Sequence, residues 1–181
     1  MIRKCKATTI GLGLLAILFS VVARAEVGAP QLSPEYHKWL KEDVRWIITD
    51  QERKDFLHLA TDSDRDKFVV NFWERRNPIS GSKTNVFKEE HYRRLAFANE
   101  HFAASVPGWR TDRGRIYVIY GPPDSVTIGI RPADGVPVQE WHYKHMKGGD
   151  DDVTLNFADE CRCGHFYLQN EPPNRGGDMS R

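Results

Sequence analysis

Six residues near the middle of the chain carry side chains that can bind an anion or move a proton. They supply an aromatic ring, a hydroxyl group, two carboxylates and two guanidinium groups, and they are Trp109, Thr111, Asp112, Arg113, Arg115 and Asp124. Arginine suits carboxylate or phosphate ligands because its planar fork donates two parallel hydrogen bonds. If the preceding helices pack on this stretch, they bring further basic side chains to it, namely Arg76, His91 and Arg94. The sequence therefore predicts a candidate ligand-binding cleft for an anion.

The same residues also have a structural interpretation, which we favour. Trp109 can close the join between two halves of the fold, while Thr111 and Asp112 accept hydrogen bonds from loop amides. The arginines can pair with nearby acids, which are Glu89, Glu90, Glu100 and Asp124. His91 falls on the apolar stripe of its helix, where a buried histidine with satisfied hydrogen bonds is expected.

Two cysteines and a histidine form a weak candidate metal site near the C-terminus. In an extended segment Cys161, Cys163 and His165 share one face, and all three side chains are ligands for zinc or copper. A disulfide between the cysteines and a pair of free thiols are the alternatives. We expect no metal and no cofactor.

Known catalytic signatures are absent from the chain. It has no G-x-S-x-G nucleophile elbow, no H-E-x-x-H zinc motif, no glycine-rich phosphate loop and no C-x-x-C pair. The sequence therefore assigns no catalytic residue. It also indicates no particular reaction that this protein would catalyse if it were an enzyme.

Helices are predicted before the central stretch. Pro at the first helical position opens a helix over Pro34–Ile48, and Thr49 with Glu52 forms a capping box that opens a second. Asp62 is expected to cap a third helix. Apolar residues that recur every three or four positions predict the longest helix, from Phe87 to Phe102.

Strands are predicted after Gly108. The residues Ile116–Tyr120 are apolar on both faces of an extended chain, which is typical of a central strand. Further strands are expected over 126–130, 138–143, 153–157 and 166–168. Turn-rich segments and no helices separate them, so an antiparallel sheet is predicted.

The N-terminal residues are typical of a secretory signal peptide. Three basic residues precede an apolar run from Ile10 to Ala23, and Ala23-Arg24-Ala25 is a small-residue cleavage site. The apolar run is shorter than the roughly 20 residues of a spanning helix. An uncleaved N-terminal anchor is the alternative. Loss of residues 1–25, which hold four basic and no acidic residues, changes the net charge from +1 to −3 and argues against a nucleic-acid binder.

The central stretch also carries a family resemblance. Gly108, Trp109, Thr111 and Asp112 stand as in the signature of the GWxTD domain, a family of secreted bacterial proteins, chiefly acidobacterial, whose biochemical role is not established. The agreement runs from about Tyr36 to Leu168. It is carried by residues 72–78, 87–94, 98–102, 114–117, 121–124 and 140–143. The resemblance implies secretion and supplies no catalytic residue. The two cysteines depart from the cysteine-free turn expected there.

These observations predict one exported α+β domain in which N-terminal helices pack on a C-terminal, largely antiparallel sheet. Its expected parts are a signal peptide (1–25), a linker (26–33), the domain (34–170, with a helical half 34–107 and a sheet half 108–170) and a flexible tail (171–181). The leading hypothesis is a non-catalytic binding or assembly module of the cell envelope, periplasmic or extracellular. Its partner would be another envelope protein, a peptide or a polymer, with no nucleic acid and no membrane span after cleavage. The alternative is an exported, hydrolase-like enzyme with a polar site around Asp112, Arg113 and Asp124.

Overall fold

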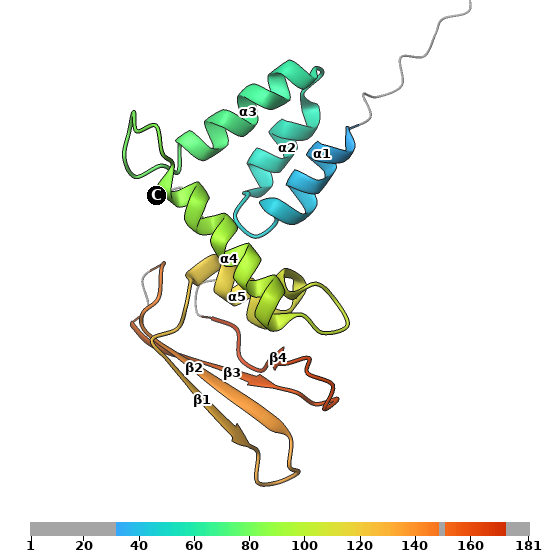
Figure 1. The fold of residues 1–181 in the computed structure, drawn as a ribbon, viewed down its shortest axis with the longest axis vertical. Helices are drawn as coiled ribbons and strands as arrows, with labels where there is room; N and C mark the ends of the chain where they lie inside the picture. Colours follow the sequence, from blue (N-terminus) through green and yellow to red (C-terminus); the bar gives the residue numbers. More distant parts are fainter. Residues whose placement is uncertain (1–31, 149–150, 173–181) are drawn as a thin grey trace, which may run out of the picture.

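The computed structural model describes residues 32–148 and 151–172, and the expected signal peptide lies outside them. Helices come first and strands second, as Figure 1 shows, which confirms the predicted α+β class. The helical elements are α1 (Pro34–Lys38), a π-helical turn η1 (Trp39–Asp43), α2 (Asp50–His58), α3 (Asp62–Glu74), α4 (Val86–Phe102), a 3-10 turn η2 (Gly108–Arg110) and α5 (Asp112–Tyr120). No helix among the described residues is long and apolar enough to cross a membrane.

The four strands form one antiparallel sheet, as predicted. They are β1 (Ser125–Ile130), β2 (Pro137–His145), β3 (Asp151–Ala158) and β4 (Tyr167–Leu168), and they lie in sequence order across the sheet. The β2–β3 pair is the longest and places Trp141 opposite Leu155 on the face that packs on the helices.

Two hydrophobic cores lie along the molecule. One is built from η1, α2 and α3. In it the ring of Trp39 packs on the rings of Phe56 and Phe72, with ring centres 5.0 and 5.1 Å apart. The other joins α4, α5 and the sheet around Trp141 and Phe157. Tyr92 of α4 packs against both cores. Helix α4 therefore connects the helical layer to the sheet (Figure 1).

The helix caps follow the sequence closely. The capping box of Thr49 and Glu52 is present in both directions. The cap of α3 is Thr61, whose side chain accepts from the amide of Asp64, so the prediction of Asp62 is wrong by one residue. The predicted helix over 34–48 is also too long, because α-helical geometry stops at Lys38 and the π-helical turn follows.

The predicted central strand at Ile116–Tyr120 is wrong, because these residues belong to helix α5. A helix with several buried faces has no amphipathic stripe, and in so short a run its sequence resembles that of a buried strand. Thr111 caps this helix, and Gly121 ends it at a φ of 91°. The change from helices to strands therefore falls at Gly121 rather than at Gly108.

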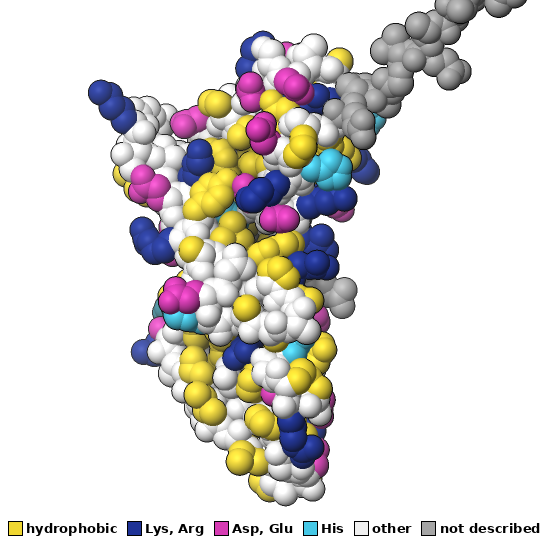
Figure 2. All heavy atoms as spheres, turned by 45° about the vertical axis from the view of Figure 1, so that its right-hand side comes forward, with side chains coloured by type: hydrophobic (Ala, Val, Ile, Leu, Met, Phe, Trp, Pro, Cys, Tyr) yellow, Lys and Arg dark blue, Asp and Glu magenta, His cyan; other side chains and the backbone are white. Residues whose placement is uncertain are grey.

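The surface carries both charges. On the face shown in Figure 2, acidic and basic side chains are interspersed among apolar patches, with no broad field of one sign.

Candidate functional site

Two glycines of the central stretch allow backbones to touch. A Cβ on Gly108 would lie 1.8 Å from the carbonyl oxygen of Ala98 in α4, and a Cβ on Gly114 would lie 1.8 Å from the carbonyl oxygen of Gly108. Real Cβ atoms do not occur at such distances from a backbone oxygen. Both positions therefore require glycine, and the glycines stack α4, η2 and α5 in close contact.

Trp109 is buried at the same junction and is 8% exposed. Its amide donates to Oδ1 of Asn99 at 3.2 Å, and its carbonyl accepts from Nε1 of Trp46 at 2.9 Å. Its side chain belongs to the core between α4 and the sheet. These contacts tie α4 to the segment after η1 and leave the ring little surface for a ligand.

Thr111 and Asp112 fasten the start of α5. The Thr111 hydroxyl donates to the Gly108 carbonyl at 2.8 Å and accepts from the Gly114 amide at 3.1 Å, and the residue is 2% exposed. Oδ2 of Asp112 accepts from the amide of Leu168 at 2.9 Å. The signature thus caps a helix and holds strand β4 against it.

Replacing Thr111 by alanine should lower the free energy of unfolding by about 2 kcal/mol, because a helix cap and a buried hydrogen bond to Gly108 are both lost. Denaturant unfolding at pH 7 measures this. Thr111→Ser keeps the hydroxyl and should recover most of the loss. Thr61→Ala removes an exposed cap and should cost about 1 kcal/mol or less. Equal losses for Thr61→Ala and Thr111→Ala would contradict the assigned contacts.

Of the remaining candidates, Arg115 lies 3.9 Å from Asp112, while Arg113 turns to other partners. Arg113 is 9% exposed, lies over the ring of Phe166 at 4.2 Å and donates to the Gly164 carbonyl at 3.2 Å. Burial lowers the pKa of Arg113. Arg115 lies 3.4 Å from Glu171.

Asp124 is engaged elsewhere. Its Oδ2 accepts from the amide of Lys144 at 2.8 Å, which joins the turn before β1 to strand β2. Asp112, Arg113 and Asp124 therefore each hold a different part of the backbone, at Leu168, Gly164 and Lys144.

A cavity of about 210 Å³ lies on the other side of the junction, between α4 and the C-terminal half of α5. Two candidates, His91 and Arg94, line this cavity. Lys147, which comes after β2 in the chain, also lines it. The full lining is Ile47, Pro78, Val86, Phe87, Glu90, His91, Arg94, Val118, Ile119 and Lys147. The structure therefore gathers two of the predicted basic residues around an apolar space, away from the N-terminus of α5.

His91 is buried, as its place on the apolar stripe predicts, with 4% of its surface exposed. Its Nε2 lies 2.5 Å from the carbonyl oxygen of Asp43 and must donate to it. Burial lowers the pKa of His91, and the charges of Arg94 and Arg76 lower it further. The ring is therefore neutral at pH 7, with Nδ1 left as an acceptor.

Two cations, Arg94 and Lys147, and one carboxylate, Glu90, line the cavity. Arg94 donates from Nε to Oε1 of Glu90 at 2.8 Å and from Nη1 to the carbonyl of Ile119 at 3.4 Å. Lys147 makes no ion pair within the part of the chain that the structure describes, and its Nζ lies 5.2 Å from the ring centre of Phe87. Partial burial lowers the pKa of Lys147, as do Arg94 and Arg76. An anionic group would relieve this repulsion.

Arg76 stands behind the cavity rather than in its lining. It forms a bidentate pair with Glu52, with nitrogen-to-oxygen distances of 2.9 and 2.7 Å, and its guanidinium lies 3.7 Å from the ring centre of Phe72. It contributes charge to the cavity, while its hydrogen bonds serve the helical core.

Sequence reasoning missed Lys147 and Glu90 as parts of this site. Glu90 was expected only as a surface partner of Arg94, and that pair is present. Lys147 lies two residues after the end of β2, and no motif marks it. Only the packing of the sheet under α4 brings it to Phe87.

The cysteines lie in the turn between β3 and β4 and are joined as a Cys161–Cys163 disulfide. His165 instead stacks on Tyr167, with ring centres 4.3 Å apart. The acid beside the sulfur atoms is Asp159, so the grouping around the disulfide is Asp159, Cys161 and Cys163. With both sulfurs bonded to each other, this structure offers no thiolate for a metal.

One comparison with known proteins finds a matching family. The family model of the GWxTD domain matches residues 25–171, which is most of the chain. The match includes all four described strands and the residues that line the cavity. No curated protein and no solved structure matches the chain.

Proposed function

The chain belongs to the GWxTD domain family, and from that premise we propose that it is an exported, non-catalytic binding module whose cavity between α4 and α5 holds the C-terminal end of an apolar peptide. The observation that carries the proposal is Lys147, a cation without an acidic partner among the described residues, at the edge of an apolar cavity. The positive charge of Lys147 favours a carboxylate at the edge of the cavity. The apolar residues that line the cavity favour an apolar side chain inside it.

The size of the cavity supports a chain end rather than a whole small molecule. Its volume of about 210 Å³ is below the roughly 300–1,000 Å³ typical of sites for drug-sized ligands. One apolar side chain with its terminal carboxylate needs less space than a drug-sized ligand. Capture of a C-terminal carboxylate is also a recurrent way of recognising peptides.

The parts of the cavity have distinct roles in this proposal. Lys147 and Arg94 attract the carboxylate, while Phe87 and Val118 pack on the terminal side chain. His91 is neutral and offers Nδ1 to a donor such as the peptide amide. Glu90 holds Arg94 in position through its 2.8 Å contact.

Calorimetric titration with short peptides tests the proposal. An N-acetylated tripeptide ending in leucine should bind, and the same peptide with a C-terminal amide should bind at least about tenfold more weakly, because the charge-assisted contact is lost. Equal binding of acid and amide would contradict the proposal, and so would no binding of either.

Lys147→Met should weaken binding of the acid peptide by about tenfold to a hundredfold, which corresponds to losing about 1.5–3 kcal/mol from a hydrogen bond to a charged group. Lys144→Met is the matched control, since Lys144 lies three residues earlier and does not line the cavity. Affinity should also fall as the pH is raised through the pKa of Lys147, which its surroundings place below the usual lysine range. Unchanged affinity in Lys147→Met would remove the assigned role of this residue.

Export is a separate part of the proposal and rests on the N-terminal sequence. Fractionation of the producing cells, followed by mass spectrometry of the intact protein, tests it. We expect a chain that begins at Glu26 in the periplasmic or extracellular fraction. A chain that keeps residues 1–25 and stays in the cytoplasm would contradict export without affecting the peptide titration.

A further inference from the structure

The Cys161–Cys163 disulfide is presented to solvent. Both cysteines are exposed, they lie in the turn between β3 and β4, and the ring they close contains only Arg162. Exposed disulfides are open to attack by an external thiolate, whereas structural disulfides are shielded. The position of this bond therefore favours exchange chemistry over a purely structural role.

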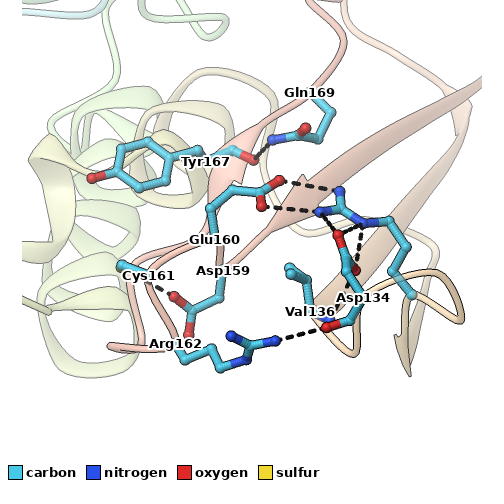
Figure 3. A network of polar contacts seen from close by, with 9 residues as sticks. Asp134, Val136, Asp159, Glu160, Cys161, Arg162, Tyr167 and Gln169 are labelled. Carbon is cyan, nitrogen blue, oxygen red and sulfur yellow. Dashed lines mark hydrogen bonds and ion pairs between the residues drawn. The ribbon is translucent and has the colours of Figure 1, made fainter.

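Contacts that do not involve sulfur hold this turn in place. Arg162 donates to the backbone carbonyl of Asp134 at 2.7 Å, and Arg131 contacts both Asp134 and Glu160, at 2.6 and 2.9 Å. Figure 3 shows Glu160 and Arg162 reaching toward the turn before β2, while Asp159 points to Cys161. These contacts would keep the two cysteines near one another after the disulfide opens.

The residue between the cysteines is strained. Arg162 has a φ of 52°, in the left-handed region that L residues with long side chains seldom occupy. Such strain persists only where the surrounding structure enforces it.

A buried carboxylate distinguishes the two sulfur atoms. Asp159 is 4% exposed and accepts from the amides of Cys163 and Gly164 at 3.0 and 2.8 Å. Its Oδ1 also lies 3.3 Å from Sγ of Cys161. The carboxylate lies within 4.8 Å of both sulfur atoms and repels an attacking thiolate most closely at Cys161, so Cys163 is the favoured target. The same charge disfavours a thiolate on Cys161, so the Cys161 sulfur must take a proton as it leaves. Once reduced, the Cys161 thiol can donate a hydrogen bond to Asp159.

We propose that Cys161 and Cys163 form a thiol–disulfide exchange site that oxidises a dithiol of a partner peptide or protein. One substrate thiolate attacks Sγ of Cys163; the bond between the two sulfurs breaks, and its electron pair leaves with Cys161, which takes a proton. The second substrate thiolate then attacks the substrate sulfur of the mixed disulfide and releases Cys163, which also takes a proton. The substrate gains one disulfide and the protein gains two thiols, so two electrons and two protons are transferred.

The reaction of the oxidised full chain with a reduced two-cysteine peptide tests this proposal. Alkylation of thiols followed by mass spectrometry should show one disulfide formed in the peptide for two thiols gained by the protein. The rate should exceed that of oxidised glutathione at the same concentration and pH by about tenfold or more. A Cys161→Ser/Cys163→Ser double variant is the control. A rate no greater than that of glutathione, or a disulfide left intact by the peptide, would overturn the proposal.

Single variants test the effect of Asp159 on the reactivity of each sulfur atom, on which the choice of Cys163 as the attacked atom depends. In Cys161→Ser, the remaining Cys163 should react with the probe 5,5′-dithiobis(2-nitrobenzoate) about fivefold or more faster than the remaining Cys161 does in Cys163→Ser, because Sγ of Cys161 lies 3.3 Å from Oδ1 of Asp159, within hydrogen-bonding distance of the carboxylate. Circular dichroism establishes that both variants are folded. Equal rates or the opposite order would overturn the assignment of Cys163.

Discussion

Gly108→Ala should destabilise this protein severely. The added methyl would meet the backbone of α4, with the carbonyl oxygen of Ala98 at 1.8 Å and its carbonyl carbon at 2.5 Å. Neither atom is the end of a flexible side chain, so α4 and η2 must separate to admit it. Overpacking usually costs about 1–3 kcal/mol and sometimes more. Here we expect a loss above about 4 kcal/mol, which is a large part of the 5–15 kcal/mol that stabilises a typical domain.

Thermal and denaturant unfolding measure this loss, and Gly129→Ala is the matched control. A Cβ on Gly129 would meet only Cγ2 of Val138, at an ordinary contact distance of 3.9 Å. That variant should change the free energy of unfolding by less than about 1 kcal/mol. A Gly108→Ala protein as stable as the Gly129→Ala protein would show that α4 and η2 are not in close contact.

Glu52→Gln should lower the free energy of unfolding at pH 7 by about 3 kcal/mol. The carboxylate accepts from Arg75 at 3.0 Å and from Arg76 at 2.9 and 2.7 Å, and it also accepts from the amide of Thr49. The amide side chain keeps an acceptor oxygen but loses the charge that balances these guanidinium groups. Arg76 is 9% exposed and would be left without its acid.

The effect of Glu52 should depend on pH in a defined direction. Burial acts to raise the pKa of Glu52, but hydrogen bonds from Arg76, Thr49 and Arg75 outweigh it and lower the pKa from 4.5 to about 2. A lowered carboxyl pKa adds stability that is fully present above the pKa of the unfolded chain and is lost as the pH falls toward the folded value. The difference between wild type and Glu52→Gln should therefore be constant near pH 7 and shrink between about pH 4.5 and 2. Urea unfolding at a series of pH values measures it, and a difference that stays constant to pH 2 would contradict the assigned pKa.

The sequence was most informative where a periodic pattern spans several turns. Apolar residues at steps of three and four predicted the longest helix to within one residue of α4 at its start and at its true end. The capping box at Thr49 was also evident, because its two partners are only three residues apart. The strands were found because turns separate them clearly.

The pattern failed at α5 for a physical reason. In this helix Ile116, Val118 and Ile119 are all buried, so apolar residues are not confined to one stripe. Alternation of apolar residues in so short a run fits a strand equally well. The residues that distinguish the two are Thr111, which caps the helix, and Gly114, which permits its close contact with η2.

The site was harder to predict than the fold. Arg94 was a candidate to join the central stretch that begins α5, but it contacts the carbonyl of Ile119, near the C-terminal end of that helix. Residues 112 and 119 are about 10 Å apart along a helix with a rise of 1.5 Å per residue. Lys147 reaches the cavity through the path of β2, and no local pattern encodes that path.

The central claim is that the GWxTD signature builds the junction of the fold, while ligand binding belongs to the adjacent cavity. The most direct test is the Kd of the leucine-terminated peptide for Asp112→Asn, measured by calorimetry at a temperature where this variant is folded. Asp112 holds the amide of Leu168 and does not line the cavity. We expect the free energy of unfolding to fall by about 1 kcal/mol and the Kd to stay within twofold of wild type. A folded Asp112→Asn protein that no longer binds the peptide would contradict the account.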